Sequence, residues 1–198
     1  MAFNKRDIEF LFEIGAIRNM PRGWVQHVGQ DVASITEHSF RVVWIALAIA
    51  RKEGVGDENK IIKMALVHDI AESRVSDLSY IQKVYVKADE EKAAKDMFEK
   101  TSFEDFQSDI LKEYEKRESI EAKIVKDADN LDIDLELKEI EERGSRLVES
   151  LQVHRKMIRK EKLYTDAAKE MWDELQEANV SAWHLTANKW YKIPDAGK

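Results

Sequence analysis

His68 and Asp69 lie side by side in a mostly apolar segment and are the first candidates for chemistry. An aspartate buried there needs a partner, because an unpaired carboxylate in a core is costly. Neighbouring residues of a helix point about 100° apart, so both side chains can reach one site at the helix end. Glu72 follows His68 by four residues and Asp69 by three, which places it on the same side of the helix. One helix thus offers an imidazole and two carboxylates to one place.

A second imidazole and a third carboxylate come from other segments. His38 stands early in a very apolar segment, and Asp129 lies four residues from both Val125 and Ile133. Asp129 is therefore on or beside a buried stripe, where a metal ion is one suitable partner for a carboxylate. Two imidazoles and two carboxylates suit Mn²⁺, Co²⁺, Fe²⁺, Ni²⁺ or Zn²⁺. Water bound to such an ion is a competent nucleophile at neutral pH, so a hydrolytic metal site is a hypothesis.

These residues also have structural interpretations. A histidine beside an aspartate in a helix is, taken alone, more often structural than metal-binding. Spacing does not separate Asp129 from its neighbours Asp127, Asp132 and Asp134, any of which could point inward. Glu72 could orient another side chain instead of transferring a proton.

The elements that position these residues are predicted to be helices, since the chain of 198 residues has only 7 Gly and 2 Pro. Ser34 or Thr36 can cap a helix that reaches about residue 52, and Asp57 caps the next one, which carries the His-Asp pair. Ser102 with Asp105 has the pattern of a capping box. The helices are expected at about 5–17, 36–52, 58–72, 87–100, 119–142, 146–160 and 165–179. No segment alternates for long enough to predict a strand.

Three further expectations concern the surface and the loops. The first helix has an apolar face of Ile8, Leu11 and Phe12 with Gly15. Segments 19–34 and 73–78 are expected to be ordered loops. The aromatic residues after Val180, namely Trp183, Trp190 and Tyr191, suggest that the tail packs on the body or on a partner.

Composition restricts the class of protein. The apolar fraction of 43% supports a core, and the net charge of −7 disfavours binding to a nucleic acid backbone. A small anionic substrate remains compatible, because one arginine or metal ion outweighs the average charge locally. The chain has no cysteine, the N-terminal segment has no signal-peptide pattern, and the longest apolar stretch, 42–50, is too short to span a bilayer. We therefore expect a cytoplasmic protein without a membrane partner.

The order of His38, His68-Asp69 and Asp129 resembles the signature of the HD-domain phosphohydrolase superfamily. Five blocks in order resemble its 5′-deoxynucleotidase branch: PRGWV at 21–25, SITEHS at 34–39, VHDIAE at 67–72, SDL at 76–78 and VKDADNL at 125–131. The bare His-Asp pair is a weak motif, whereas the five blocks together are specific. The resemblance covers about residues 5–144.

The resemblance implies an all-α HD-domain helical bundle, with a single domain over 1–198, a core at about 5–144, and C-terminal helices and an aromatic tail at 145–198. It implies one divalent ion (Mn, Co, Fe, Ni, Zn or Mg) held by four ligands: His38, His68, Asp69 and Asp129. Arg22 would bind the substrate phosphate, and Trp24 would lie near the sugar and help exclude a ribose 2′-hydroxyl. Glu72 would act on the attacking water or the leaving group, and Asp77 on the sugar 3′-hydroxyl or the leaving oxygen.

Other readings of these residues remain. Arg22 and Trp24 could simply anchor their loop, and Asp77 could cap a short helix that starts at Leu78. Ser76 departs from the pattern of the relatives, which usually have glycine there, so the substrate loop can differ in shape. Di-metal members of the superfamily have additional histidines between the His-Asp pair and the last aspartate, whereas no histidine lies between His68 and His154 here. The resemblance therefore favours a one-metal hydrolase over a di-iron oxygenase.

The remaining three histidines, His27, His154 and His184, are read as non-catalytic. His27 lies in the loop of Arg22 and could reach the site, whereas His154 belongs to a basic, solvated face.

The resulting prediction is a phosphohydrolase that acts on nucleoside 5′-monophosphates, preferring deoxyribonucleotides, and forms a homodimer. The alternatives are a phosphodiesterase or pyrophosphohydrolase on nucleotides, and a non-catalytic nucleotide-binding regulatory module.

Overall fold

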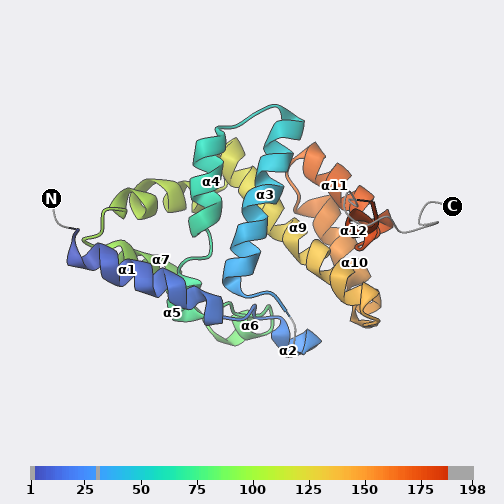
Figure 1. The fold of residues 1–198 in the computed structure, drawn as a ribbon, viewed down its shortest axis with the longest axis horizontal. Coiled ribbons are helices and arrows are strands. Elements are labelled where there is room, and N and C mark those ends of the chain that lie inside the picture. Colours follow the sequence, from blue (N-terminus) through green and yellow to red (C-terminus); the bar gives the residue numbers. More distant parts are fainter. Residues whose placement is uncertain (1–2, 30–31, 187–198) are drawn as a thin grey trace.

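The computed structural model describes residues 3–29 and 32–186, which form helices and connecting loops (Figure 1). Within these ranges the only strand-like pairing is a single bridge between Pro21 and Ser34, so the predicted all-α fold is confirmed. The elements are α1 Lys5–Ala16, η1 Ile17–Asn19, α2 Val25–Val28, α3 Ile35–Glu53, α4 Glu58–Val67, α5 Glu72–Val75, α6 Gln82–Tyr85, α7 Glu90–Phe98, η2 Phe106–Leu111, α8 Lys112–Lys116, α9 Ile120–Glu142, α10 Leu147–Glu161, α11 Asp166–Glu177 and α12 Ala182–Thr186.

Helices α3 and α9 form the centre of the molecule and contact each other extensively. Helix α4 packs on both of them, α11 packs on both from another direction, and α10 packs on α9 and α11. Helices α1, α5 and α7 contact one another away from α10 and α11, as Figure 1 shows. The core lies where α3, α4 and α9 meet.

Helix α3 starts and ends where its sequence dictates. The Ser34 hydroxyl accepts from the Glu37 amide, and the Glu37 carboxylate accepts from the Ser34 amide, which completes a capping box. Gly54 ends the helix with φ of 70°, a left-handed conformation that glycine adopts at low cost. Because its buried positions recur at helical spacing, α3 carries His38 into the core.

Helix α4 is shorter than predicted, which corrects the position of the His-Asp pair. It ends at Val67, and the amides of Ile70 and Glu72 instead donate to carbonyls three residues earlier. The ring Nδ1 of His68 contacts the Ala65 carbonyl oxygen at 2.8 Å. His68 and Asp69 therefore occupy a tight turn between α4 and α5, rather than the interior of one helix.

Two other expectations were wrong. Ser102 does not cap a helix with Asp105, because its amide and hydroxyl both donate to Asp7 of α1. The face of α1 that packs inward carries Asp7 and Phe10, whereas Leu11 and Phe12 are exposed.

The aromatic tail gives a mixed result. Trp183 is 72% exposed, so it does not pack on the body. Trp190 and Tyr191 lie outside the described residues.

None of the described helices combines the length and the apolar character that crossing a bilayer requires.

Candidate metal centre and substrate cavity

The four predicted metal ligands come together from three segments. His38 lies on α3, His68 and Asp69 lie in the turn after α4, and Asp129 lies on α9. One donor atom from each lies within 4.8 Å of the other three. His38 Nε2 is 3.3 Å from a carboxylate oxygen of both Asp69 and Asp129, and 3.2 Å from His68 Nε2.

These separations fit one shared ion. Ligands bound to an ion at about 2.1 Å lie roughly 3 Å or more from each other. The two carboxylates supply negative charge, and the two imidazoles supply the nitrogen donors that transition metals favour. The donor set therefore fits a divalent transition metal.

Both imidazoles are held with Nε2 toward the centre. His38 Nδ1 lies 2.6 Å from Asp132 Oδ2, and His68 Nδ1 lies against the Ala65 carbonyl. Asp132 is itself fixed by Arg41, which also donates to Glu139 at 2.7 Å. Such contacts to the far ring nitrogen select the tautomer that offers Nε2 as a ligand.

The local charges show that the centre attracts cations. Burial disfavours the charged imidazole of His38, but hydrogen bonds with Asp129, Asp132 and Asp69 outweigh it and raise the pKa well above the ordinary value. Burial opposes the charge of Asp129, yet Lys126 and His38 hold its pKa far below the usual range. A cation is therefore favoured where these side chains meet.

Helix α9 buries four aspartates, and each has a different partner. Asp129 faces the centre, and Asp132 orients His38. Asp127 accepts hydrogen bonds from the amides of Tyr164 and Thr165, at 2.8 Å each, and from the Thr165 hydroxyl. The fourth, Asp134, pairs with Arg155 of α10 at 2.8 Å.

The predicted phosphate-binding loop lies directly beside this centre. The Arg22 side chain is buried, with Nη1 3.2 Å from Asp69 Oδ2 and Nε 3.2 Å from Asp77 Oδ2. Burial disfavours its charge, but Asp69 and Asp77 raise its pKa above the ordinary value. Asp77 also accepts from the Gly23 amide at 2.9 Å.

Asp77 does not cap a helix at Leu78, as the alternative reading supposed. The short helix nearby is α6, and the Ser79 side chain accepts from the amide of Gln82 in its first turn.

Glu72 is a buried carboxyl whose pKa is raised. Burial, together with the charges of Asp69 and Asp77, raises its pKa to about 9. A divalent ion nearby would lower this value, because its charge favours the carboxylate. Glu72 is therefore placed to hold or release a proton beside the centre.

A cavity of about 460 Å³ opens from the centre. Its lining includes Arg22, Trp24, Asp69, Glu72, Asp77 and Asp129, and it extends to α10. Three buried atoms on its lining residues, Trp24 Nε1, His27 Nε2 and Glu72 Oε2, have no hydrogen-bonding partner in the described part of the chain. Because buried polar groups are normally paired, these atoms point to a polar ligand.

Sequence reasoning missed three contributors. Lys126 lines the cavity and donates to Asp129 at 2.6 Å, and its spacing of three residues on α9 was the available signal. Asp132 was considered only as a rival to Asp129. His154 was assigned to a solvated face; it is exposed, as expected, but it also lines the cavity.

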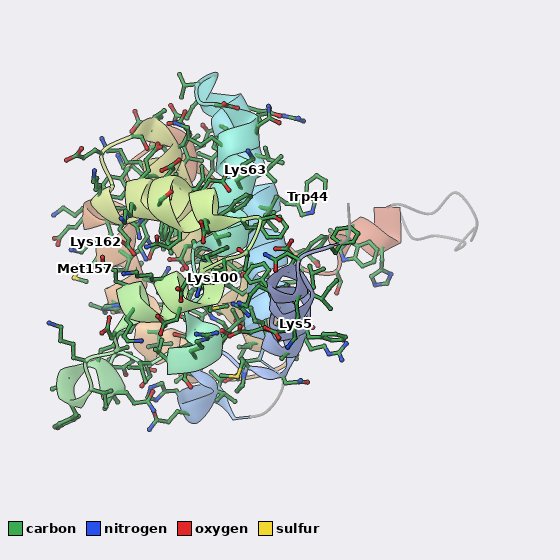
Figure 2. The ribbon with its side chains drawn as sticks, turned by 90° about the vertical axis from the view of Figure 1, so that its left-hand side faces the viewer. Lys5, Trp44, Lys63, Lys100, Met157 and Lys162 are labelled. Atoms are coloured by element: carbon green, nitrogen blue, oxygen red, sulfur yellow. The ribbon has the colours of Figure 1, made fainter. Side chains whose placement is uncertain are left out.

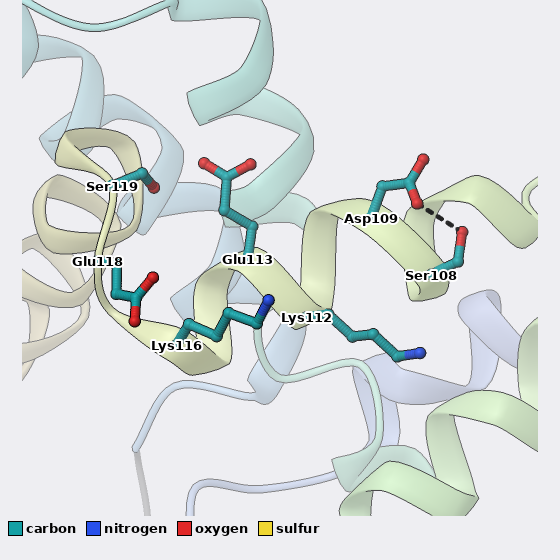
Figure 3. A pocket seen from close by; sticks show the side chains of 7 residues that line it. All are labelled: Ser108, Asp109, Lys112, Glu113, Lys116, Glu118 and Ser119. Carbon is teal, nitrogen blue, oxygen red and sulfur yellow. Dashed lines mark hydrogen bonds between the residues drawn. The ribbon is translucent and has the colours of Figure 1, made fainter.

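A second hollow lies on the surface at η2 and α8 and takes in none of the predicted site residues (Figure 3). Its lining mixes Lys112 and Lys116 with Asp109, Glu113 and Glu118. Side chains of both signs at an open surface are typical of a solvated face, and we assign no role to it.

Comparison with known proteins connects this site to a family. The HD domain family matches residues 14–172. A relative from Dictyostelium discoideum, 5′-deoxynucleotidase HDDC2, is 30% identical over 158 residues, which cover 71% of this chain and 80% of the relative.

Solved structures share the fold. A protein from Pyrococcus horikoshii has a TM-score of 0.70 and 29% identity, over 86% of this chain and 98% of its own. The HD phosphohydrolase of cyanophage S-2L, solved bound to dA and one catalytic Zn²⁺ ion, has a TM-score of 0.55 and 17% identity, over 84% and 96%. The predicted resemblance is thereby confirmed, and the chain belongs to the HD domain family.

Proposed function

We propose that this protein is a metal-dependent phosphohydrolase that removes the phosphate from nucleoside 5′-monophosphates and prefers deoxyribonucleotides. The observation that carries the proposal is the cluster of four donor atoms, two of which belong to Asp69 and Asp129 in the lining of a cavity that also contains Arg22, Glu72 and Asp77. Two relatives named 5′-deoxynucleotidase support the substrate class. One is 30% identical over 71% of this chain, and the other is 32% identical over 68% of it.

The metal would be one divalent ion, held by His38, His68, Asp69 and Asp129. When bound, it would lower the pKa of a coordinated water and offset the charge of the phosphoryl oxygens. The donor set accepts Mn²⁺, Co²⁺, Fe²⁺, Ni²⁺, Zn²⁺ or Mg²⁺, and availability decides among them.

Residues around the ion bind the phosphate and transfer protons. Arg22 presents guanidinium N–H groups to the phosphate, because its position between Asp69 and Asp77 fixes the plane of the fork. Glu72 takes the proton of the attacking water or supplies one to the leaving sugar oxygen. Its pKa of about 9 keeps the carboxyl protonated in the absence of metal, as the second role requires.

The sugar end is assigned to Asp77 and Trp24. Asp77 accepts a hydrogen bond from the 3′-hydroxyl, and Trp24 fills the space that a 2′-hydroxyl needs. Both line the cavity, and Trp24 Nε1 has no partner in the described part of the chain.

We also propose that two copies associate in the cytoplasm. Phe40 and Trp44 of α3 form an edge-to-face pair with ring centroids 6.4 Å apart, yet Trp44 is 61% exposed and points away from the body in Figure 2. Phe12 of α1 is 77% exposed. Exposed aromatic side chains of this size favour burial against another protein surface.

The test is phosphate release from purified ribo- and deoxyribonucleoside monophosphates, with Mn²⁺, Co²⁺, Mg²⁺ or chelator. We expect metal-dependent release, faster from the deoxy substrates, and loss of release in Asp69→Ala and Glu72→Ala. Asp173→Ala, in an exposed ion pair with Arg159, is the control and should retain activity. Metal-loaded protein that releases no phosphate from any monophosphate contradicts the proposal and favours diester substrates or a non-catalytic role.

A further inference from the structure

Helix α10 forms one wall of the cavity, and it lies outside the five sequence blocks that resemble the family. The lining residues Leu147, Leu151, His154 and Ile158 recur at spacings of four, three and four residues, so one face of the helix looks into the cavity. Ile133 of α9 lines the same cavity.

The orientation of this face is fixed by a buried ion pair. Arg155 donates to Asp134 and to the Asn130 carbonyl of α9, at 2.8 Å each. Val148 and Arg155 are buried on α10, whereas Leu147, Leu151 and Ile158 remain only half-buried. The folded chain therefore leaves apolar surface uncovered along a cavity, where a ligand can cover it.

The cavity lining combines two kinds of side chain. Arg22, Asp69, Glu72, Asp77 and Lys126 are charged, whereas Leu147, Leu151 and Ile158 of α10 and Ile133 of α9 are apolar. A nucleoside monophosphate also combines two kinds of group, with an anionic phosphate at one end and a flat, largely apolar base at the other. The volume of about 460 Å³ lies in the range of sites for small molecules.

We propose that Leu147, Leu151 and Ile158 of α10, with Ile133 of α9, hold the nucleobase of the substrate by apolar contact. The inference rests on the proposed function and adds the base-binding surface to it. Contact with the face of the ring is available to every base, so this surface binds bases without selecting strongly among them. His154 stands exposed on the same helix face and offers one polar contact at the rim.

A substrate without a base tests this directly. The kcat/KM for phosphate release is measured on 2-deoxyribose 5-phosphate and on deoxynucleoside monophosphates, for wild type, Leu151→Ala and Val153→Ala. We expect Leu151→Ala to lower kcat/KM for the nucleotides about tenfold and to leave the base-free substrate unchanged. Val153, 82% exposed on α10 and not among the lining residues, is the matched control and should change neither value.

Two results overturn the inference: equal losses on both substrates in Leu151→Ala, or no loss on either. A binding measurement tests the base site independently of the proposed catalytic activity. Calorimetric titration of the metal-loaded protein with deoxyadenosine should show binding by the wild type and at least tenfold weaker binding by Leu151→Asp. If no monophosphate is hydrolysed but this difference holds, the proposed function fails and the base site stands; equal binding by both proteins contradicts the base site.

Discussion

Gly23 allows the proposed phosphate-binding loop and the Asp77 loop to approach each other closely. A Cβ atom at this position would lie 2.1 Å from the Asp77 carbonyl oxygen, 2.9 Å from the Ser79 amide nitrogen and 3.0 Å from the Asp77 carbonyl carbon. All three atoms are backbone, so no side-chain rotation relieves the contact. The position of Arg22 therefore depends on the absence of a side chain at the next residue.

Gly23→Ala should displace Arg22 and lower kcat/KM about tenfold or more, because small displacements of a positioning group are costly in catalysis. Steady-state kinetics with a deoxynucleoside monophosphate measure this. Gly15→Ala, where an added Cβ meets no atom within 4 Å, is the control and should keep full activity. Unchanged kinetics in Gly23→Ala would show that the two loops do not need this close approach.

Ser76 carries a strained backbone conformation, with φ of 67° and ψ of 154°. This region is nearly restricted to glycine, and other residues in it cost about 1–3 kcal/mol. Ser76→Gly should therefore increase the free energy of unfolding by about 1 kcal/mol, after the larger backbone entropy of unfolded glycine is subtracted. Thermal unfolding measures the change. Ser76→Ala keeps the Cβ and should give little change; an equal gain from both substitutions would contradict the strain.

The residue types at the centre could be predicted from the sequence, but their supports could not. The apolar pattern indicates that the charges of Asp69 and Asp129 are buried and need partners. The same argument applies equally to Asp132, which in the structure orients His38. The family resemblance selects Asp129 as the ligand, but the contact of Asp132 with His38 follows only from three-dimensional packing.

Among the elements, helix α9 connects the proposed metal centre to the C-terminal helices. Asp129 serves the centre, while Asp127, two residues earlier, accepts three hydrogen bonds from Tyr164 and Thr165 at the start of α11. Residues two apart on a helix point to different sides. One short acidic segment therefore serves two distinct regions of the fold.

Asp127→Ala should lower the free energy of unfolding by about 3 kcal/mol, because it leaves buried amides unpaired at the start of α11. Denaturant unfolding measures the loss, and Asp127→Asn, which keeps one acceptor oxygen, should lose less. Metal content should remain one ion per chain in both. Loss of the ion with little change in stability would mean that the roles of Asp127 and Asp129 are exchanged.

The longer helices were predictable, since caps such as Ser34, Asp57 and Ser119 mark their starts. The short helices α2 and α5 lie in segments that were expected to be loops. The end of α4 at Val67 was not predictable, because the apolar spacing continues through Ile70. The contact of the His68 ring with the Ala65 carbonyl accompanies the change in backbone pairing there. A periodic pattern reports which residues are apolar and does not register such a side-chain contact.

For the whole molecule, the proposed dimer would bury the exposed aromatic residues of α1 and α3. Light scattering during size-exclusion chromatography should give the mass of two chains for the wild type and of one chain for Trp44→Glu. Val153→Glu, an exposed apolar position on α10, should leave the mass at two chains. A wild type with the mass of one chain contradicts the proposed dimer.

An anomalous difference map from crystals grown with Mn²⁺ would locate the proposed ion. We expect one strong peak per chain, about 2.0–2.3 Å from Nε2 of His38 and His68 and from a carboxylate oxygen of Asp69 and Asp129. A crystal with Mn²⁺ bound elsewhere, and these four side chains paired only with one another, would contradict this expectation.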